Sequence, residues 1–276
     1  MRVVVTNINA GLWAASYLKQ TVQTFAPGPD KPFTLGLPTG QTVLDMYAIL
    51  RCFAQERLMS FQHIFTFNMD EYVGLAQDHP QSYFSYMRRQ LWEPVNMPLP
   101  NRFIPDGMAA SLPDECARYE QEIARVGGLR LVVGGIGNNG HIAFNEPGTP
   151  FNSRTHVVDL TPMTLKANAR FFGGDESRVP RRAITVGIGT ILDAQELLFI
   201  ATGVQKAAAV EYVCNLPTNV DWPITALTLH PRATLVVDLD ACLLLSGEMK
   251  NRLDEARQAD PHAEQWVLFS EEKPCN

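Results

Sequence analysis

The sequence predicts a doubly wound α/β fold, in which helices flank a mostly parallel sheet. Short apolar runs alternate with segments of helical periodicity along most of the chain. Most of these runs are continuously apolar, as expected for strands that are buried on both faces. The 276 residues, 46% of them hydrophobic, suffice for a sizeable core. Because no linker divides the chain, we expect a single domain over residues 1–276.

Seven short runs are the predicted strands. Each is dominated by apolar residues and is bounded by polar or turn-forming residues. In chain order they are Val3–Thr6, Phe33–Leu37, Ile64–Phe67, Leu129–Gly134, Ile184–Val186, Leu197–Ala201 and Thr234–Asp238.

Four segments between these runs are predicted helices, because their apolar residues recur every three or four positions. Asp114–Val126 has the clearest limits, since Ser111 can cap its start and Gly127-Gly128 can end it. The other three segments are Thr42–Glu56, Gln81–Trp92 and a late helix, Leu239–Arg257.

Two segments have no regular periodicity. Phe151–Arg182 is polar and contains Gly173-Gly174 and Pro180, and we interpret residues 151–182 as a lid-like insertion. The end of the chain, from about Ala259, predicts no element, and Pro274-Cys275-Asn276 is typical of an exposed tail.

Composition excludes several classes of function. The net charge of −6 argues against non-specific nucleic-acid binding, although it allows a small anionic ligand. No long apolar run or signal peptide is present, so we expect a cytoplasmic protein without membrane contact. The five cysteines form no CxxC pair, so neither a zinc site nor a disulfide framework is indicated.

Four polar, glycine-containing clusters begin where predicted strands end. They occupy residues 38–42, 68–71, 135–148 and 203–206. In open α/β sheets, ligands bind beyond the carboxyl ends of the strands. We therefore expect these clusters to converge on one pocket.

The first and last clusters suit an anion. Thr39–Thr42 leads into a helix, whose free N–H groups can bind phosphate, although the same residues also suit a plain turn. Lys206 lies early in a predicted helix, where a cation opposes the helix dipole. A phosphate partner would account for this placement, and a solvated lysine is the alternative.

The two middle clusters suit proton transfer. Asp70 and Glu71 could act as a base and its structural partner, or could simply begin a helix. The third cluster contains GxGxxG, but a dinucleotide site is not favoured because Asn145–Gly148 predicts a turn where that motif needs a helix. His141 and Glu146, five residues apart, could form an imidazole–carboxylate pair instead.

These motifs resemble those of the glucosamine-6-phosphate deaminase family, in the family's order and over nearly the whole chain. The matching stretches are LGLPTGQT (35–42), FNMDEYVGL (67–75), HPQSYF (79–84), GGIGNNGHIAFNEPG (134–148), SRT (153–155), RFF (170–172), AITVGIGTILDA (183–194), GVQKA (203–207) and LHPRATLVVD (229–238). The resemblance implies a Rossmann-like fold and the conversion of D-glucosamine 6-phosphate and water to D-fructose 6-phosphate and ammonia. It implies no metal or organic cofactor and a homo-oligomer.

The resemblance also implies roles for particular residues. Asp70 falls on the base that moves a proton from C2 to C1, His141 on the residue that opens the sugar ring, and Glu146 on its acidic partner. The phosphate ligands fall on Thr39, Gly40, Gln41, Thr42, Arg170 and Lys206.

One catalytic position departs from the common pattern, since Asn139 stands where many family members carry Asp. An amide can hold His141 by a hydrogen bond but cannot stabilise imidazolium as a charge would. We therefore predict that Glu146 carries this role alone.

Three rival functions remain open on the sequence. A galactosamine-6-phosphate deaminase/isomerase would differ only in the C4 stereochemistry of its substrate. A 6-phosphogluconolactonase would need no C2 base, so Asp70 argues against it. A catalytically inactive sugar-phosphate sensor is the third alternative, and Asn139 keeps it open.

Overall fold

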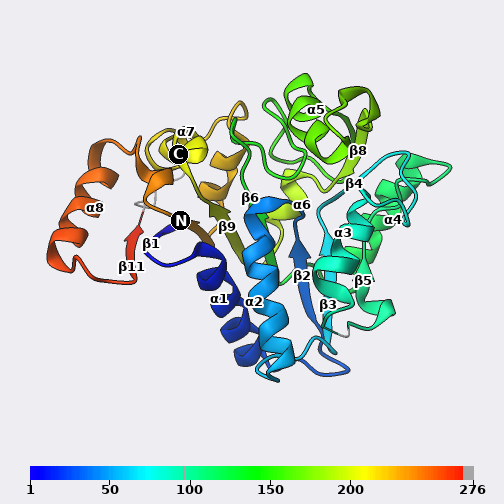
Figure 1. The fold of residues 1–276 in the computed structure, drawn as a ribbon, viewed down its shortest axis with the longest axis horizontal. Helices are drawn as coiled ribbons and strands as arrows, with labels where there is room; N and C mark the ends of the chain where they lie inside the picture. Colours follow the sequence, from blue (N-terminus) through cyan, green and yellow to red (C-terminus); the bar gives the residue numbers. More distant parts are fainter. Residues whose placement is uncertain (96, 270–276) are drawn as a thin grey trace.

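An eight-stranded sheet forms the centre of the computed structural model, which describes residues 1–95 and 97–269 (Figure 1). The strand order is β11-β1-β10-β9-β6-β2-β3-β5, and all neighbours are parallel except β11 against β1. The strands are β1 (Arg2–Thr6), β2 (Phe33–Leu37), β3 (Ile64–Asn68), β5 (Arg102–Phe103), β6 (Leu131–Gly135), β9 (Leu197–Ala201), β10 (Ala233–Val237) and β11 (Gln265–Phe269). The predicted doubly wound, mostly parallel fold is confirmed.

Hydrophobic clusters cover both faces of this sheet, which explains the continuously apolar strands. In β1, Val3 and Val5 pack on one face and Val4 on the other. The Val4 face is covered by α1 (Ala10–Phe25) and α2 (Leu44–Gln55). The opposite face is covered by α4 (Leu112–Arg125), α6 (Ile188–Leu192), α7 (Ala207–Asn215) and α8 (Gly247–Ala259).

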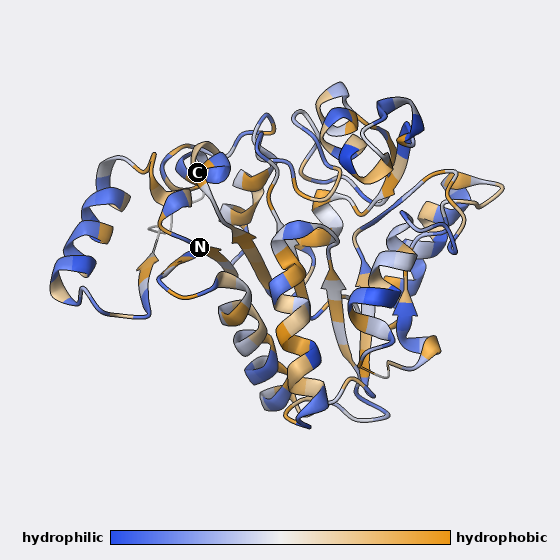
Figure 2. Ribbon diagram, in the orientation of Figure 1, coloured by the Kyte–Doolittle hydropathy of each residue, from blue (hydrophilic) through white to orange (hydrophobic). Residues whose placement is uncertain are grey.

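Helices α2 and α8, which lie on opposite faces of the sheet, differ in hydropathy. In Figure 2, α2 is largely hydrophobic, whereas α8 is mostly hydrophilic and lies at one end of the molecule. Within α8 only Met249 and Leu253 are buried. Among the described residues, no helix combines the length and the apolar character needed to cross a membrane.

A second, antiparallel sheet stands beyond the carboxyl end of β3. It consists of β4 (Asp70–Tyr72), β8 (Arg182–Thr185) and β7 (His156–Asp159), in the order β4-β8-β7. The predicted strand Ile184–Val186 therefore lies largely in this sheet and not in the central one. A short apolar run gives no information about which partner strand will bury it, so the sequence left this assignment open.

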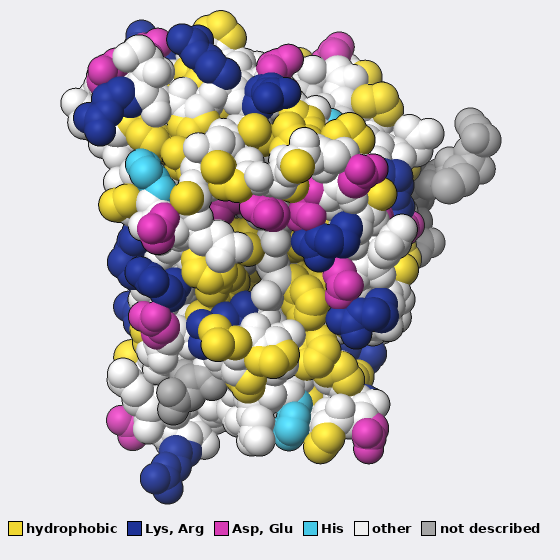
Figure 3. All heavy atoms as spheres, turned by 90° about the vertical axis from the view of Figure 1, so that its right-hand side faces the viewer, with side chains coloured by type: hydrophobic (Ala, Val, Ile, Leu, Met, Phe, Trp, Pro, Cys, Tyr) yellow, Lys and Arg dark blue, Asp and Glu magenta, His cyan; other side chains and the backbone are white. Residues whose placement is uncertain are grey.

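The segment predicted as a lid-like insertion is folded. It contains β7 and α5 (Pro162–Asn168), and it packs its own hydrophobic cluster against Tyr72. The buried members from this segment are Leu160, Leu165, Ala169, Phe172 and Val179. In Figure 3, basic side chains lie along the top of the molecule, in the region of this segment, and acidic side chains cross the middle of the face.

Two predicted helices begin later than expected. The segment from Leu239 forms only a short 3-10 turn before α8, which begins after Ser246. The helix predicted from Gln81 begins at α3 (Tyr83–Met87), because Ser82 caps its first turn through its side chain, and it continues as a π-helical turn. Leu243 and Leu244 are more than half exposed, so their apolar character does not reflect a buried helix face.

The sequence analysis missed several elements, among them α1 and β11, and one of its predictions falls outside the described residues. Helix α1 has small buried residues, Ala14 and Ala15, which give a weak periodic signal. The antiparallel edge strand β11 lies in the segment for which no element was predicted. The predicted tail, Pro274-Cys275-Asn276, lies outside the described residues.

Candidate active site

A pocket of about 580 Å³ opens at the carboxyl ends of β2, β3, β6 and β9, and α5 forms part of its wall. The four polar clusters converge there, as the sequence predicts. The site residues proposed from the sequence that line this pocket are Thr39, Gly40, Gln41, Thr42, Asp70, Asn139, His141, Arg170 and Lys206. Glu146 does not line it and lies behind His141, bonded to the same group of side chains.

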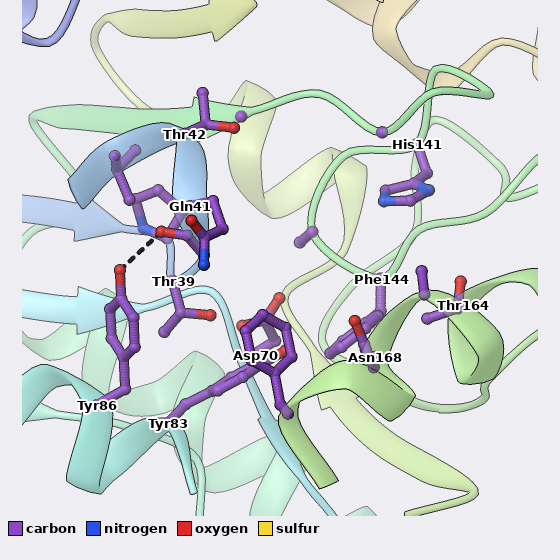
Figure 4. A pocket seen from close by; sticks show the side chains of 18 of the residues that line it. Thr39, Gln41, Thr42, Asp70, Tyr83, Tyr86, His141, Phe144, Thr164 and Asn168 are labelled. Carbon is purple, nitrogen blue, oxygen red and sulfur yellow. Dashed lines mark hydrogen bonds between the residues drawn. The ribbon is translucent and has the colours of Figure 1, made fainter. Parts of the chain in front are cut away.

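Asp70 projects into the pocket from the start of β4, immediately beyond β3 (Figure 4). It is only 7% exposed, and its Oδ1 has no hydrogen-bond partner among the described residues. Burial, together with the nearby charge of Glu71, raises the pKa of Asp70 to about 8. A carboxylate in this state is a strong base once it is ionised.

Glu71 turns away from the pocket and has a structural role. Its carboxylate accepts hydrogen bonds from the backbone N–H groups of Tyr72, Tyr83 and Phe84, at 2.8–2.9 Å. Burial raises the pKa of Glu71 to about 7, although these three bonds act in the opposite direction. Of the two adjacent acids, Asp70 therefore faces the pocket, and Glu71 ties β4 to the start of α3.

Asn139 connects His141 to Glu146. Its Oδ1 lies 2.7 Å from Nδ1 of His141, and its Nδ2 donates to Oε2 of Glu146 at 2.8 Å. The direct separation between His141 Nδ1 and Glu146 Oε2 is longer, at 3.6 Å. An Oδ1 acceptor places the hydrogen on Nδ1 and leaves Nε2 free to accept a proton. The hydrogen bond from His141 to the amide that the sequence analysis allowed is present, and Glu146 is the carboxylate beside this pair. That Glu146 alone stabilises the imidazolium stays a prediction.

Gly137 shows why this loop needs glycine. A Cβ atom at Gly137 would lie 2.2 Å from the His141 ring, so any other residue would displace the imidazole. The GxGxxG pattern therefore makes room for a side chain, and no helix follows it before β7. This agrees with the expectation that it is not a dinucleotide motif.

Glu146 is buried, but neighbouring side chains donate hydrogen bonds to its carboxylate. Thr164 of α5 donates to Oε1 at 2.6 Å, and Asn139 donates to Oε2. Burial alone would raise the pKa of Glu146, but the nearby imidazole of His141 and the bonds from Thr164 and Asn139 outweigh it and lower the pKa to about 2. The sequence analysis missed Thr164, which carries no motif and lies 18 residues from Glu146.

The loop at the end of β2 is fixed by two tyrosines. Tyr86 donates to the carbonyl of Gly40 at 2.7 Å, the bond drawn in Figure 4, and Tyr47 donates to the carbonyl of Pro38 at 2.5 Å. Gly40 has a φ of 108°, a conformation that favours glycine. The loop leads through a 3-10 turn, Gln41–Val43, into α2, and its backbone N–H groups suit an anion.

Two cations complete this side of the pocket. Lys206 lies where a 3-10 turn leads into α7, and its Nζ donates to Oδ1 of Asn138 at 2.7 Å. Burial and the neighbouring charge of Arg170 lower the pKa of Lys206. Arg170 itself lies over the ring of Phe171, with its guanidinium carbon 4.7 Å from the ring centroid. Two cations held close together favour a multiply charged anion between them.

No metal site accompanies these groups in the part of the chain that the structure describes. There, no three or more His, Cys, Asp or Glu side chains are grouped so that they could hold a metal ion.

Comparison with known protein families gives a match over most of the chain. Residues 12–236 match the family model described as glucosamine-6-phosphate isomerases/6-phosphogluconolactonase. A glucosamine-6-phosphate deaminase of Fusobacterium nucleatum is 46% identical over 243 residues, which cover 88% of this chain and 89% of that protein. Glucosamine-6-phosphate deaminase 1 of Mus musculus is 48% identical over 236 residues, 86% of this chain and 82% of that protein.

Solved structures give a consistent result. A structure described as a monomeric glucosamine-6-phosphate deaminase superposes with a TM-score of 0.84 at 39% identity, covering 88% of this chain and all of that one. The 6-phosphogluconolactonase of Thermotoga maritima superposes with a TM-score of 0.67 at 18% identity, covering 86% of this chain and 98% of that one. The second likeness concerns the fold alone.

Proposed function

The chain belongs to the family of glucosamine-6-phosphate isomerases and 6-phosphogluconolactonases, and on that premise we propose that it is a glucosamine-6-phosphate deaminase. It would convert D-glucosamine 6-phosphate and water to D-fructose 6-phosphate and ammonia. Two relatives with 46% and 48% identity, both named as deaminases, support this proposal over the lactonase branch of the family.

The observation that carries the proposal is the state of Asp70. This carboxyl group is buried in the pocket, lacks a partner at Oδ1, and has a pKa raised to about 8. An aldose–ketose isomerisation needs a base that removes a proton from carbon, whereas lactone hydrolysis does not. The positively charged amino group of the substrate, bound beside Asp70, would favour the ionised and reactive form of this carboxyl group.

Phosphate binding and ring opening come first in the proposed mechanism. The loop of Thr39–Thr42, Arg170 and Lys206 would hold the phosphate at one end of the pocket. His141 would then take the proton of the anomeric hydroxyl on Nε2 and deliver it to the ring oxygen, which gives the open-chain aldehyde. While His141 holds this proton it is a positively charged imidazolium, which Glu146 would stabilise through the amide of Asn139.

Isomerisation and deamination follow. Asp70 would remove the proton from C2, and the C2 electron pair would form a double bond to C1. The aldehyde oxygen would take a proton from the substrate's ammonium group and become a hydroxyl, which leaves the nitrogen as an amine with a lone pair. Asp70 would return its proton to C1, and the nitrogen lone pair would form an iminium ion at C2. Water would add to C2, and loss of ammonia would leave the ketone of fructose 6-phosphate.

The direct test measures ammonia and fructose 6-phosphate formed from glucosamine 6-phosphate, with galactosamine 6-phosphate assayed in parallel. Equimolar products from the gluco substrate support the proposal. Activity on the galacto substrate alone would keep the mechanism and replace the substrate. Binding without turnover of either sugar would instead indicate a sensor, and the proposal would be wrong.

We further propose that residues 1–276 work as one domain in which residues 151–182 close over the substrate. Support comes from the position of α5 on the pocket wall and of Arg170 just beyond it. A closing segment would exclude water from the reaction. Limited proteolysis should cut within residues 151–182 more slowly when fructose 6-phosphate is present, and an unchanged cutting rate would argue for a fixed wall.

The quaternary structure and the location of the protein remain predictions. The resemblance implies a homo-oligomer, yet one of the similar solved structures is described as monomeric. Light scattering coupled to size exclusion would measure the mass of the particle directly. The predicted cytoplasmic location can be tested by cell fractionation.

A further inference from the structure

The helix α5 contacts the predicted catalytic groups through side chains that no sequence motif marks. Thr164 is 7% exposed, and its Oγ1 donates to Oε1 of Glu146 at 2.6 Å. Thr161, at the start of the same helix, places its Oγ1 3.0 Å from that of Thr164 and 3.3 Å from Oε1 of Glu146. Among the described residues, the hydrogen bonds to Oε1 of Glu146 therefore come from α5 and its N-cap residue.

The other oxygen of Glu146 points toward the histidine. Oε2 accepts from Asn139 and lies 3.6 Å from Nδ1 of His141. A carboxylate group is planar and rotates as one unit, so a bond that fixes Oε1 also fixes the direction of Oε2. The position of α5 thus determines how Glu146 faces the amide and, through it, the imidazole.

The same helix is attached to other parts of the pocket. Asn168 donates to the hydroxyl of Tyr72 at 2.8 Å, and Tyr72 belongs to the strand that begins with Asp70. Arg170 follows in the next turn, close enough to Lys206 to lower its pKa. The lid segment thus contacts Glu146 through Thr164, the strand of Asp70 through Asn168, and the predicted phosphate site through Arg170. Figure 4 shows Thr164 and Asn168 at the edge of the pocket, near Phe144.

We propose that Thr164 is a positioning residue for ring opening: its hydroxyl transmits the position of the lid segment to Glu146 and so orients the His141–Asn139–Glu146 chain. When the segment is docked, Glu146 is held toward Asn139; when it moves away, Glu146 loses this donor and is free to rotate. The inference rests on the proposed function, because it concerns one step of that reaction.

A purely structural role for Thr164 makes a different prediction. The cap of α5 is formed by the side chain of Thr161, which accepts from the backbone N–H of Thr164, so the hydroxyl of Thr164 is not needed for the cap. Thr164→Val keeps the branched shape of the side chain and replaces the hydroxyl with a methyl group, which cannot donate a hydrogen bond. If the hydroxyl matters only for folding, this variant should lose stability but keep its rate per folded molecule.

The first experiment compares steady-state kinetics of three variants with the wild type. Thr164→Val should lower kcat by about tenfold to a hundredfold, as expected for the loss of a hydrogen bond to a charged group, with KM within about threefold. Thr164→Ser restores the hydroxyl and should recover most of the rate. Lys166→Ala, at an exposed position of the same helix that does not line the pocket, is the matched control and should leave the rate unchanged.

The second experiment isolates ring opening from the later steps. In an Asp70→Asn background the C2 proton is not removed, yet His141 can still open and close the sugar ring. Magnetisation transfer between the two anomeric protons of glucosamine 6-phosphate measures this exchange by NMR. We expect the enzyme-dependent exchange to fall about tenfold or more when Thr164→Val is added to Asp70→Asn. Thr164→Ala replaces Thr164→Val if the latter does not fold.

The outcomes separate the inference from the proposed function. If the wild type releases no ammonia from glucosamine 6-phosphate, the proposed function itself is wrong. If the wild type is active but Thr164→Val keeps both its kcat and its anomer exchange within about threefold, Thr164 has no positioning role. If Thr164→Ser is as slow as Thr164→Val, the methyl group's packing and not the hydroxyl is responsible, and the inference is overturned.

Discussion

Two carboxylates of the candidate active site are almost equally buried but have opposite proton affinities. Asp70 is 7% exposed and Glu146 is 8% exposed. The pKa of Asp70 is raised to about 8, whereas that of Glu146 is lowered to about 2. The difference lies in their neighbours. Glu146 faces the imidazole of His141 and accepts hydrogen bonds at both oxygens, whereas Asp70 lies near the charge of Glu71 and its Oδ1 has no partner among the described residues.

The comparison shows that neighbouring charges and hydrogen bonds, and not burial alone, decide the protonation state of an acid in this pocket. A group of high pKa can accept and return a proton, and a group of low pKa can supply a permanent negative charge. The high pKa of Asp70 suits the proposed transfer of a proton from C2 to C1. The low pKa of Glu146 suits the stabilisation of a protonated His141 during ring opening.

Removing the carboxylate of Asp70 should have the largest effect. Asp70→Asn should lower kcat by about a thousandfold, within the range for loss of a general base. A raised carboxyl pKa costs stability as the pH rises from about 4 toward 8, so the variant should be more stable than the wild type, by about 1–4 kcal/mol at pH 8. Urea unfolding at pH 5 and pH 8 measures this, and a difference that does not grow with pH would contradict the raised pKa.

Removing the charge of Glu146 should have the opposite effect on stability. Glu146→Gln should lower kcat by about a hundredfold and destabilise the fold by about 1–3 kcal/mol at pH 7. A lowered carboxyl pKa gives stability above pH 4.5 that is lost as the pH falls toward 2, so the difference from wild type should shrink on acidification. The same unfolding series tests this, and equal stability at pH 7 would show that Glu146 is not held in its charged form.

The pH dependence of the wild type sharpens the comparison. Because only ionised Asp70 can act as the base, kcat/KM should rise by about tenfold per pH unit from pH 6 and level off near pH 8. Glu146 stays ionised throughout this range and should not contribute. A flat profile between pH 6 and pH 8 would mean that the free enzyme already holds Asp70 in its ionised form.

Lys206 and Arg170 should affect substrate binding, measured by KM, more than the rate of the reaction, measured by kcat. Lys206→Met and Arg170→Met should each raise KM by about tenfold to fiftyfold and should change kcat less, as expected for the loss of a charge-assisted bond to phosphate. Inorganic phosphate, tested as a competitive inhibitor, should bind more weakly by a similar factor. Unchanged inhibition by phosphate would place the anion elsewhere in the pocket.

The smallest effect is expected at Asn139. Asn139→Asp replaces the donor to Glu146 by a second carboxylate at a 2.8 Å contact, so it should raise the pKa of Glu146 and cost about 1 kcal/mol at neutral pH. The loss should be relieved below about pH 5, where one of the two acids takes a proton. Thermal unfolding at pH 5 and pH 7 checks this. A variant as stable as wild type at both values would mean that the two side chains can move apart.

Much of the fold was readable because the sheet is covered on both faces. Strands such as Leu197–Ala201 must then be apolar at every position, which gives a strong local signal. The run at Ile184–Val186 has the same composition but pairs with β4 and β7, since pairing depends on distant strands. Helix α1 was missed because its buried face is made partly of alanine.

The sequence by itself determined the family, the order of the polar clusters and the residue types available for chemistry. It named Asp70, His141 and Glu146 as candidates, but it gave no information on where the side chains of Asp70 and Glu71 point. Only the tertiary structure turned one toward the pocket and bonded the other to the backbone of α3.

The tertiary structure alone also decided how the candidates are connected. Thr164 reaches Glu146 across 18 residues, and Asn168 reaches Tyr72 across 96. Proton affinity depends on burial and on donors within about 3 Å, and both are supplied by segments distant in the chain. For this reason the sequence could indicate which acids were present, whereas the fold set their opposite pKa values.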